Sequence, residues 1–307
     1  MNNLSILINR EVWEHRNAFL IVPTIITSFF LVMLLLFFSA SLTDLLDVKV
    51  EFGDHEKTDL DQHLAENNHV TWIVSKLVDT SAMRRAEVLD FGLQMLSMPL
   101  SLGLWLVMFF YLLACLYDER RDRSILFWKS MPVSDGMTVL AKLVTGVLFI
   151  PLIYLVCIAI LQFLALIMLS LVSFNSETTA TEMIWTSSGL IGNWMSYIGV
   201  ILFYSAWSLP FFAWLMLVSA AARSLPLAWA LGLPAALALV ERLLLGETLI
   251  TDWAWRHVFP IGFLLPDQSS ADNLIDRAWS IEMLSAIFLG FFFLFVATWF
   301  RKRAREL

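Results

Sequence analysis

The sequence predicts an all-α integral membrane protein with six transmembrane helices and both termini in the cytoplasm. Of its 307 residues, 59% are apolar, and the mean hydropathy is +0.75. Soluble domains are typically only about 45–50% apolar. Two further observations support this fold class: six long apolar segments, and an uneven distribution of lysine and arginine between them.

Each of six segments supplies the roughly 20 mostly apolar residues that a helix needs to cross a bilayer. The first is too long for the apolar core of a signal peptide and is preceded by Glu11 and Glu14, so we interpret it as an uncleaved anchor. The fifth is short if it ends at Glu241, but residues 243–245 can extend it. The six segments are 18–41, 91–117, 143–172, 197–222, 225–240 and 283–300.

The orientation follows from the positive charges, which accumulate on the cytoplasmic side of membrane proteins. With both termini inside, the cytoplasmic segments hold 12 Lys and Arg against 7 acids, and the outer segments hold 8 against 20. The basic C-terminal stretch at 301–307 strengthens this assignment. We therefore treat residues 1–307 as one transmembrane domain.

Four segments outside the predicted spans have a character of their own. Residues 1–17 carry Leu4, Leu7, Ile8 and Val12 at helical spacing, which predicts an amphipathic helix in the cytoplasmic interface. The other three are a long acidic external loop at 42–90, a cytoplasmic loop at 118–136, and an external region at 246–281 whose aromatic part, 251–266, is too short to cross and suggests a re-entrant piece.

The acidic loop contains three histidines among four carboxylates, so a divalent-metal site is conceivable there. Their spacing matches no established ligand pattern, and a solvated acidic loop is the favoured interpretation. The residues are His55, His63, His69, Asp54, Asp59, Asp61 and Glu66.

The sequence contains no motif of an enzyme. It lacks GxxxxGK[ST], HExxH and GxSxG, so we expect no catalytic residue, cofactor or metal in this chain. Cys115 and Cys157 are interpreted as small buried apolar residues. The net charge of −7 argues against nucleic acid as a partner.

The apolar segments contain no Asp, Glu, Arg or His, and Lys142 lies at the cytoplasmic start of the third, where it can snorkel to the interface. Ion-coupled transporters usually need such groups at mid-membrane. The absence is therefore compatible with a transporter powered from outside the membrane or with a packed structural bundle. The first five segments each hold a mid-span proline, a hinge or a plain packing feature: Pro23, Pro99, Pro151, Pro210 and Pro234.

The cytoplasmic loop combines many charges with four consecutive apolar residues. Glu119 precedes Arg123 by four, which predicts a helical ion pair extending the second span. The stretch 125–128 covers a full helical turn, Pro132 ends it, and Ser134 is placed to cap the helix that becomes the third span. Two interpretations remain open: an anchor in anionic lipid headgroups, or an apolar knob with a cationic rim for a cytoplasmic partner.

The stretch DERRDRSILFWKSMPVSD, followed by TVLAKL, resembles the cytoplasmic loop of ABC-2 type permeases. The predicted spans, amphipathic N-terminal segment and outer re-entrant region are similar to that family along the whole chain, although the first external loop is long. The resemblance implies a pair of permease subunits, a second copy or a homologue, each docked through this loop on a separate ATPase that binds ATP and Mg. It assigns the ATPase-coupling interface to Glu119, Arg120, Arg121, Arg123, Ile125, Leu126, Phe127, Trp128 and Lys129.

Together these observations predict the permease subunit of an ATP-driven exporter in a bacterial inner membrane, surrounded by lipid and moving an amphipathic or apolar substrate. The alternative is a non-transporting anchor or assembly factor that recruits a cytoplasmic protein through the same loop. The direction of transport rests on the resemblance alone.

Overall fold

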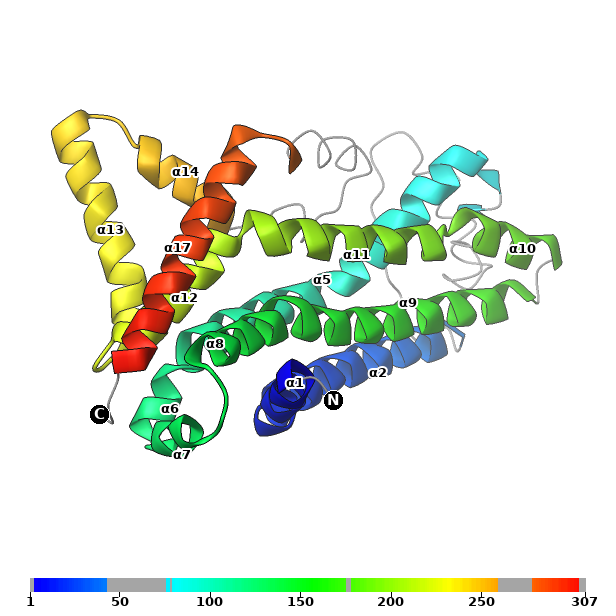
Figure 1. The fold of residues 1–307 in the computed structure, drawn as a ribbon. Helices are drawn as coiled ribbons and strands as arrows, with labels where there is room; N and C mark the ends of the chain where they lie inside the picture. The colour runs from blue at the N-terminus through cyan, green and yellow to red at the C-terminus, as the bar shows by residue number, and fades with distance from the viewer. Residues whose placement is uncertain (1–2, 43–75, 78, 175–177, 259–277, 304–307) are drawn as a thin grey trace. The chain divides into compact units, whose positions relative to one another are not determined.

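The computed structural model describes residues 3–42, 76–77, 79–174, 178–258 and 278–303, which are helical or in short connections and form no strand (Figure 1). Six helical stretches within these ranges are long and apolar enough to cross a membrane. They are Asn17–Ser39, Ala82–Arg121, Asp135–Leu171, Glu182–Trp207, Pro226–Leu245 and Ile281–Arg303. This part of the chain is therefore that of a multi-pass membrane protein, as the sequence predicts.

The helices belong to two compact units. Unit 1 comprises Met1–Pro23, Ser101–Leu155 and Met195–Leu307, and unit 2 comprises Thr24–Leu100 and Val156–Trp194. The division falls within four helices: α2 (Val22–Leu42), α5 (Ala82–Ala114), α9 (Ile150–Phe174) and α11 (Leu190–Trp207).

Unit 2 has a small apolar core of Leu93, Leu166, Ile184 and Leu190. The buried polar side chain of Gln162 is hydrogen-bonded within the unit. The Gln162 amide donates to the Leu93 carbonyl at 3.2 Å and accepts from the indole N–H of Trp194 at 2.9 Å. Helix α10 (Thr178–Ser187) completes the unit.

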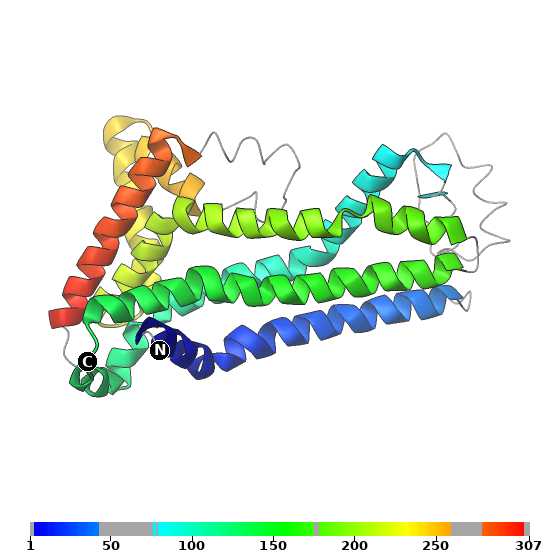
Figure 2. The ribbon, with the colours of Figure 1, turned by 45° about the vertical axis from the view of Figure 1, so that its right-hand side comes forward.

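Unit 1 contains the N-terminal helix, the loop predicted to be cytoplasmic and the C-terminal spans. In chain order it holds α1 (Asn3–Glu14), η1 (Asn17–Ile21), α6 (Tyr117–Arg121), α7 (Ser124–Ser130), α8 (Asp135–Val144), η2 (Thr145–Phe149), α12 (Leu209–Ala221), α13 (Pro226–Leu245), α14 (Leu249–Val258) and α17 (Ile281–Arg303). Helices α12 and α17 pack side by side (Figures 1 and 2). Their close approach depends on Gly290, where a Cβ would lie 2.5 Å from Leu209 Cγ.

The fourth predicted span, 197–222, is not one continuous helix. The chain interrupts the helix at Ser208, which separates α11 from α12, and Pro210 lies in the first turn of α12 rather than at mid-span. A proline is tolerated in a first turn because the N–H that it lacks has no intrahelical partner there. The fifth span continues through Glu241 to Leu245, as the extension by residues 243–245 predicts.

Two other prolines follow π-helical turns. Pro23 comes directly after η1 and Val22, and Pro151 comes after η2 and Ile150. Proline provides no N–H for the carbonyl four residues earlier, and a π-turn is one way for a helix to accommodate that loss. Only Pro99 and Pro234 lie inside regular α-helix in the described spans.

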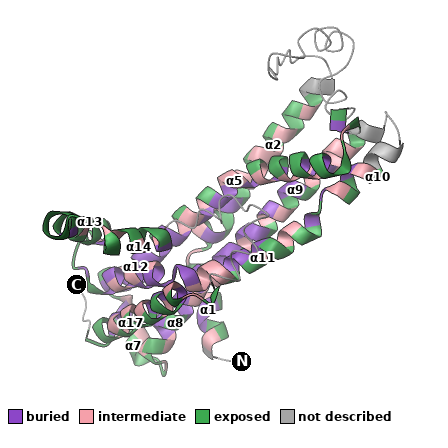
Figure 3. Cartoon of the chain, turned by 90° about the horizontal axis from the view of Figure 1, so that it is seen from above, coloured by how far each residue is buried: buried purple, intermediate pink, exposed green. Residues whose placement is uncertain are grey.

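The N-terminal segment is helical at Asn3–Glu14, and its apolar side contacts protein. Leu7 and Ile8 of α1 are buried in a cluster with Ala141 of α8, and Leu4 packs against the same cluster. Trp13 lies on the surface and is mostly exposed. Helix α13, in contrast, exposes apolar side chains along most of its length (Figure 3), as a helix surrounded by hydrocarbon can.

The six-span arrangement predicts that the connection after the second span and the one after the fifth lie on opposite sides of the membrane. In a Cys115→Ala, Cys157→Ala background, we expect an impermeant maleimide to label Glu247→Cys on intact cells and Asp122→Cys only after lysis. Both positions are exposed in the structure. Labelling of both positions on intact cells would contradict the arrangement.

Candidate functional site

The loop predicted to be cytoplasmic, 118–136, folds into two short helices. Helix α6 ends at Arg121, and Arg123 adopts a left-handed conformation, with φ of 60°, before α7 begins at Ser124. The apolar stretch is helical, as predicted, and α7 ends before Pro132. The Ser134 hydroxyl accepts a hydrogen bond from the Met137 N–H at 3.2 Å, which confirms that Ser134 caps α8.

The predicted ion pair between Glu119 and Arg123 is wrong. Helix α6 has ended before Arg123, and the Glu119 carboxylate is buried among cations from three other helices. Its Oε1 lies 3.2 Å from Arg10 Nη2 and 3.1 Å from Lys142 Nζ, and its Oε2 pairs with Arg301. Local spacing predicts a partner only when longer-range cations do not compete for the same oxygens.

A second buried carboxylate, Glu11 of α1, lies beside the first. Both of its oxygens lie 2.9 Å from Lys142 Nζ, and Oε1 lies 2.6 Å from Arg10 Nη2. The Tyr111 hydroxyl donates to Oε2 at 3.1 Å. Lys142 therefore does not snorkel to solvent as predicted, because two buried carboxylates surround its ammonium group.

Asp135 of α8 completes the cluster by pairing with Arg301 at 3.1 Å. We call this set the ion cluster; it contains three cations and three carboxylates, so the charges of its six members balance, and Arg10 also pairs with the exposed Glu14 carboxylate at 3.3 Å. The members are Arg10, Glu11, Glu119, Asp135, Lys142 and Arg301. The ion cluster joins α1, α6, α8 and α17. A single charge buried without a partner would carry a large desolvation cost, so these charges are buried together as pairs.

A reciprocal pair of caps attaches α6 to α12. The Ser219 hydroxyl oxygen of α12 accepts from the backbone N–H groups of Leu116 and Tyr117, each at 3.0 Å. The buried Arg120 guanidinium donates to the Ser219 and Ala222 carbonyls at 2.8 and 2.6 Å. Free groups at the start of one helix and the end of the other are thus satisfied together.

The nine residues of the predicted coupling interface have different environments. Glu119, Arg120 and Ile125 are buried and hold the loop in place. Arg121, Arg123 and Lys129 are exposed, and the Lys129 ammonium donates to the Lys302 carbonyl near the end of α17 at 3.2 Å.

The aromatic and aliphatic side chains of α7 also differ from one another. The ring of Trp128 is half-buried beneath the Arg10 guanidinium, which lies 3.5 Å from the ring centroid. Leu126 and Phe127 are 54% and 59% exposed. These two residues are the most exposed large apolar side chains of the loop, and Met131, just after α7, is 42% exposed.

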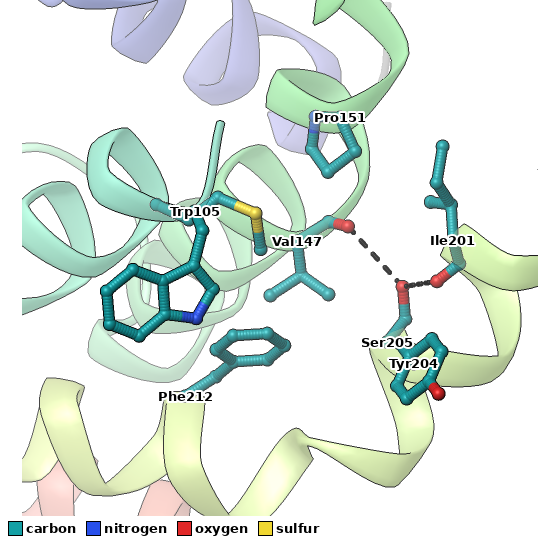
Figure 4. Close-up of a pocket in the computed structure, with 8 residues that line it drawn as sticks. Trp105, Val147, Pro151, Ile201, Tyr204, Ser205 and Phe212 are labelled. Carbon is teal, nitrogen blue, oxygen red and sulfur yellow. Dashed lines mark hydrogen bonds between the residues drawn. The ribbon is translucent and has the colours of Figure 1, made fainter. Parts of the chain in front are cut away.

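An apolar pocket lies deeper in unit 1, next to the π-turn η2 (Figure 4). Because Pro151 offers no N–H, the Val147 carbonyl lacks its usual helical donor, and the Ser205 hydroxyl lies 3.4 Å from it. Aromatic rings make up much of the wall, so the pocket suits an apolar group. It is lined by Trp105, Met108, Val147, Pro151, Ile201, Tyr204, Ser205 and Phe212.

Near the C-terminal end of α13, the Glu241 side chain binds the start of the next helix, α14. Its carboxylate accepts from the Ile250 and Thr251 N–H groups at 2.6 and 3.0 Å and from the Thr251 hydroxyl at 2.6 Å. It thereby caps α14, the described part of the predicted re-entrant region. Helix α14 has 10 residues, too few to cross a membrane.

The buried His257 of α14 lies between two tryptophans. Its ring centroid is 4.7 Å from that of Trp207 and 4.2 Å from that of Trp253, with interplanar angles of 11° and 32°. Two such rings must occupy opposite faces of the imidazole. The Nδ1 atom lies 2.7 Å from the Trp253 carbonyl, and Nε2 is buried without a hydrogen bond in the described structure.

The acidic loop, interpreted as solvated, falls outside the described residues, because His55, His63 and His69 lie in the range 43–75. Among the residues that the structure describes, no group of three or more His, Cys, Asp or Glu is placed to hold a metal ion. Cys115 is a buried free thiol and Cys157 is half-buried.

No protein-family model, curated protein or solved structure matches this chain.

The ion cluster predicts a strong dependence of stability on Lys142. Replacing Lys142 by Met leaves buried carboxylates short of a cation and should cost about 3–5 kcal/mol, measured as a lower unfolding temperature in detergent. Adding Glu11→Leu restores the balance at two cations and two carboxylates, so the double variant should recover much of the loss. Lys302→Met, at an exposed position, is the control and should change little.

The buried histidine predicts acid sensitivity. Burial lowers the pKa of His257, against a smaller opposing effect of its contact with the Trp253 carbonyl. The unfolded chain therefore takes up a proton below about pH 6.5 more readily than the folded one. Stability is fully present above that pH and should fall as the pH drops towards the lowered value.

Burial also lowers the pKa of His15, so both histidines act in the same direction. His257→Phe should reduce the decrease in unfolding temperature between pH 7.5 and 5.5, and His257→Phe with His15→Phe should reduce it further. An unchanged pH profile in the His257 variant would show that its protonation does not contribute.

Proposed function

We propose that this chain is the membrane-spanning permease subunit of an ATP-driven exporter, with hydrolysis performed by a separate ATPase subunit. The observation that carries the proposal is the loop of α6 and α7. This loop presents the exposed Leu126 and Phe127 beside the exposed arginines Arg121 and Arg123. Buried side chains of α6 connect the loop to four other helices.

The attachment of the loop to several helices supports a role in transmitting motion to the spans. Glu119 joins α6 to α1, α8 and α17 through the ion cluster, and Arg120 joins it to α12. A force applied to Phe127 would therefore reach the starts or ends of several spans rather than one flexible connection. A simple lipid anchor would not need its loop attached to so many helices.

The composition of the spans supports transport of an amphipathic or apolar substrate. The predicted apolar cores lack acidic groups and histidine, so the ion-coupling chemistry of secondary transporters has no obvious site there. The pocket next to η2 has a volume of about 30 Å³, so it has room for no more than a small apolar group of such a substrate. Two permease copies, or one copy and a homologue, in a bacterial inner membrane complete the proposal.

The decisive experiment uses the tagged full-length chain purified in mild detergent from its native host. The proposal expects a P-loop ATPase to co-purify, and ATP hydrolysis in proteoliposomes of the complex to accompany movement of an apolar dye. The alternative of a non-transporting anchor expects a bound cytoplasmic protein but no dye movement. Absence of any ATPase from the purified complex would overturn the proposal.

Substitution of the exposed Leu126 and Phe127 is the most direct test of the proposed ATPase contact. Leu126→Ala with Phe127→Ala should weaken ATPase binding by about 2 kcal/mol, roughly thirtyfold in affinity, because a large apolar side chain at an interface centre carries much of its energy. The unfolding temperature of the permease alone should stay unchanged. Trp128 is left in place because its ring supports Arg10.

The matched control is the exposed pair at the start of α14. Leu249 and Ile250 are 66% and 54% exposed, so Leu249→Ala with Ile250→Ala removes similar apolar surface at a position outside the loop. It should leave ATPase binding intact. Equal binding by both double variants would contradict the coupling role of the loop.

A further inference from the structure

Helix α17 has two opposite faces whose side chains differ in size and exposure. One face packs against α12, and Gly290 allows the close approach of the two helices (Figures 1 and 2). The buried apolar and small residues of this face are Met283, Ala286, Gly290 and Ala297. The opposite face carries large aromatic side chains that remain exposed. They are Phe288, Phe292, Phe295 and Trp299, with exposed fractions of 76%, 52%, 71% and 40%.

The four aromatic side chains form a column that ends at two cations. Successive members of the column are three or four residues apart, which places them on one side of an α-helix. Lys302 and Arg303 follow Trp299 at the same two spacings, so they extend the column on that side. The Arg303 guanidinium lies over the Trp299 ring, 3.9 Å from its centroid. We call this face, from Phe288 to Arg303, the lipid face.

The two cations at the end of the lipid face are positioned to meet an external anion. Their neighbour Arg301 is buried and pairs with two carboxylates of the ion cluster. Lys302 and Arg303 are exposed, and neither pairs with a carboxylate among the residues that the structure describes. The partial negative charge at a helix C-terminus opposes anion binding. Here the Lys129 ammonium donates to the Lys302 carbonyl at 3.2 Å and offsets that charge.

The order of these groups along α17 matches the boundary of a bilayer. The helix that is apolar enough to cross a membrane ends at Arg303, so the phenylalanines lie at the depth of the acyl chains. Trp299 lies between them and the cations, and tryptophan is enriched at the interface because its ring is amphipathic. Lysine and arginine side chains at this level reach the headgroups and are attracted most strongly to anionic lipids.

We propose that the lipid face of α17 is a binding site for an anionic phospholipid. The phosphate lies at Lys302 and Arg303, and an acyl chain lies along Phe295, Phe292 and Phe288. The paired cations give the site its preference for anionic over zwitterionic lipid, and the aromatic column gives it affinity for a lipid rather than for a soluble anion. This inference requires only that the chain lies in a membrane, so it does not depend on the proposed permease function.

The test titrates the delipidated full-length chain in mild detergent with phosphatidylglycerol or phosphatidylcholine and follows the unfolding temperature. Phosphatidylglycerol should raise that temperature at the lower concentration. Lys302→Gln with Arg303→Gln should weaken the apparent affinity for phosphatidylglycerol by about 25-fold, roughly fivefold for each charge removed, and leave the response to phosphatidylcholine unchanged. Without lipid, the unfolding temperature should stay the same, because both side chains are exposed.

The matched control removes two exposed arginines outside the lipid face. Arg121→Gln with Arg123→Gln takes the same charge from the loop of α6 and α7 and should keep the preference for phosphatidylglycerol. Equal responses of the native chain to the two lipids would overturn the inference. A preference for phosphatidylglycerol that survives Lys302→Gln with Arg303→Gln, or that the control loses to the same extent, would overturn it as well.

Two further measurements distinguish a lipid from a soluble anion. Phe292→Ala with Phe295→Ala should weaken the response to both lipids, because it removes the contact with the acyl chain while the cations remain. Glycerol phosphate has the headgroup chemistry without acyl chains, and it should not raise the unfolding temperature at the concentrations at which the lipid does. An equal rise with glycerol phosphate contradicts the proposal, since a soluble anion then suffices.

A photo-crosslinking amino acid at position 292 tests the site in the native membrane, independently of stability in detergent. The lipid adducts should be enriched in anionic phospholipid relative to the membrane as a whole, and Lys302→Gln with Arg303→Gln should abolish the enrichment. Adducts with the composition of the bulk membrane overturn the inference. A crosslink mainly to another protein, including a second copy of this chain, also overturns it, because the face is then a protein interface.

Discussion

The arrangement of unit 1 depends on keeping the buried Glu119 carboxylate in contact with cations. A carboxylate removed from water is costly unless opposite charge and hydrogen bonds replace its hydration. Here the replacement comes from Arg10, Lys142 and Arg301, whose positions in the sequence range from the tenth residue to the 301st. Helices α1, α8 and α17 must therefore converge on the loop before its charge can be buried. Since Glu11 and Asp135 neutralise the remaining cations, the convergence is complete only when all four helices are in place.

Much of the fold could be predicted because a bilayer requires long apolar helices, and long apolar segments can be recognised directly in the sequence. A run of about 20 apolar residues has few alternatives to a spanning helix, and local signals such as the Ser134 cap depend on neighbours three residues away. The break at Ser208 was missed because Pro210 supports two interpretations, a kink within a helix or the start of a new one. Hydropathy does not distinguish them, since both sides of the break are equally apolar.

The candidate site was only partly predictable for a related reason. The loop and its apolar turn are local features, but apart from their contact with each other, Glu119 and Lys142 have partners more than 100 residues away in the sequence. Charges in a loop are normally expected to face water, so their burial carries no signal in one sequence. The contacts that Ser219 and Arg120 make between α6 and α12 were missed likewise, because a serine in an apolar span usually bonds to its own helix. Which of the loop's apolar residues stay uncovered could be decided only once Arg10 was placed over Trp128.

The burial of the ion cluster bears on how the chain acquires its orientation. Under the predicted orientation, Arg10, Lys142 and Arg301 belong to the twelve cytoplasmic cations that favour an inward position of the loops and termini. In the folded chain each of them is paired with a carboxylate and contributes little to the surface charge. Under that orientation, these cations can act as a topology signal only on the nascent polypeptide, before they meet their carboxylates. The same side chains thus serve biogenesis first and architecture afterwards, and a substitution among them can alter topology in the cell even where the finished protein would tolerate it.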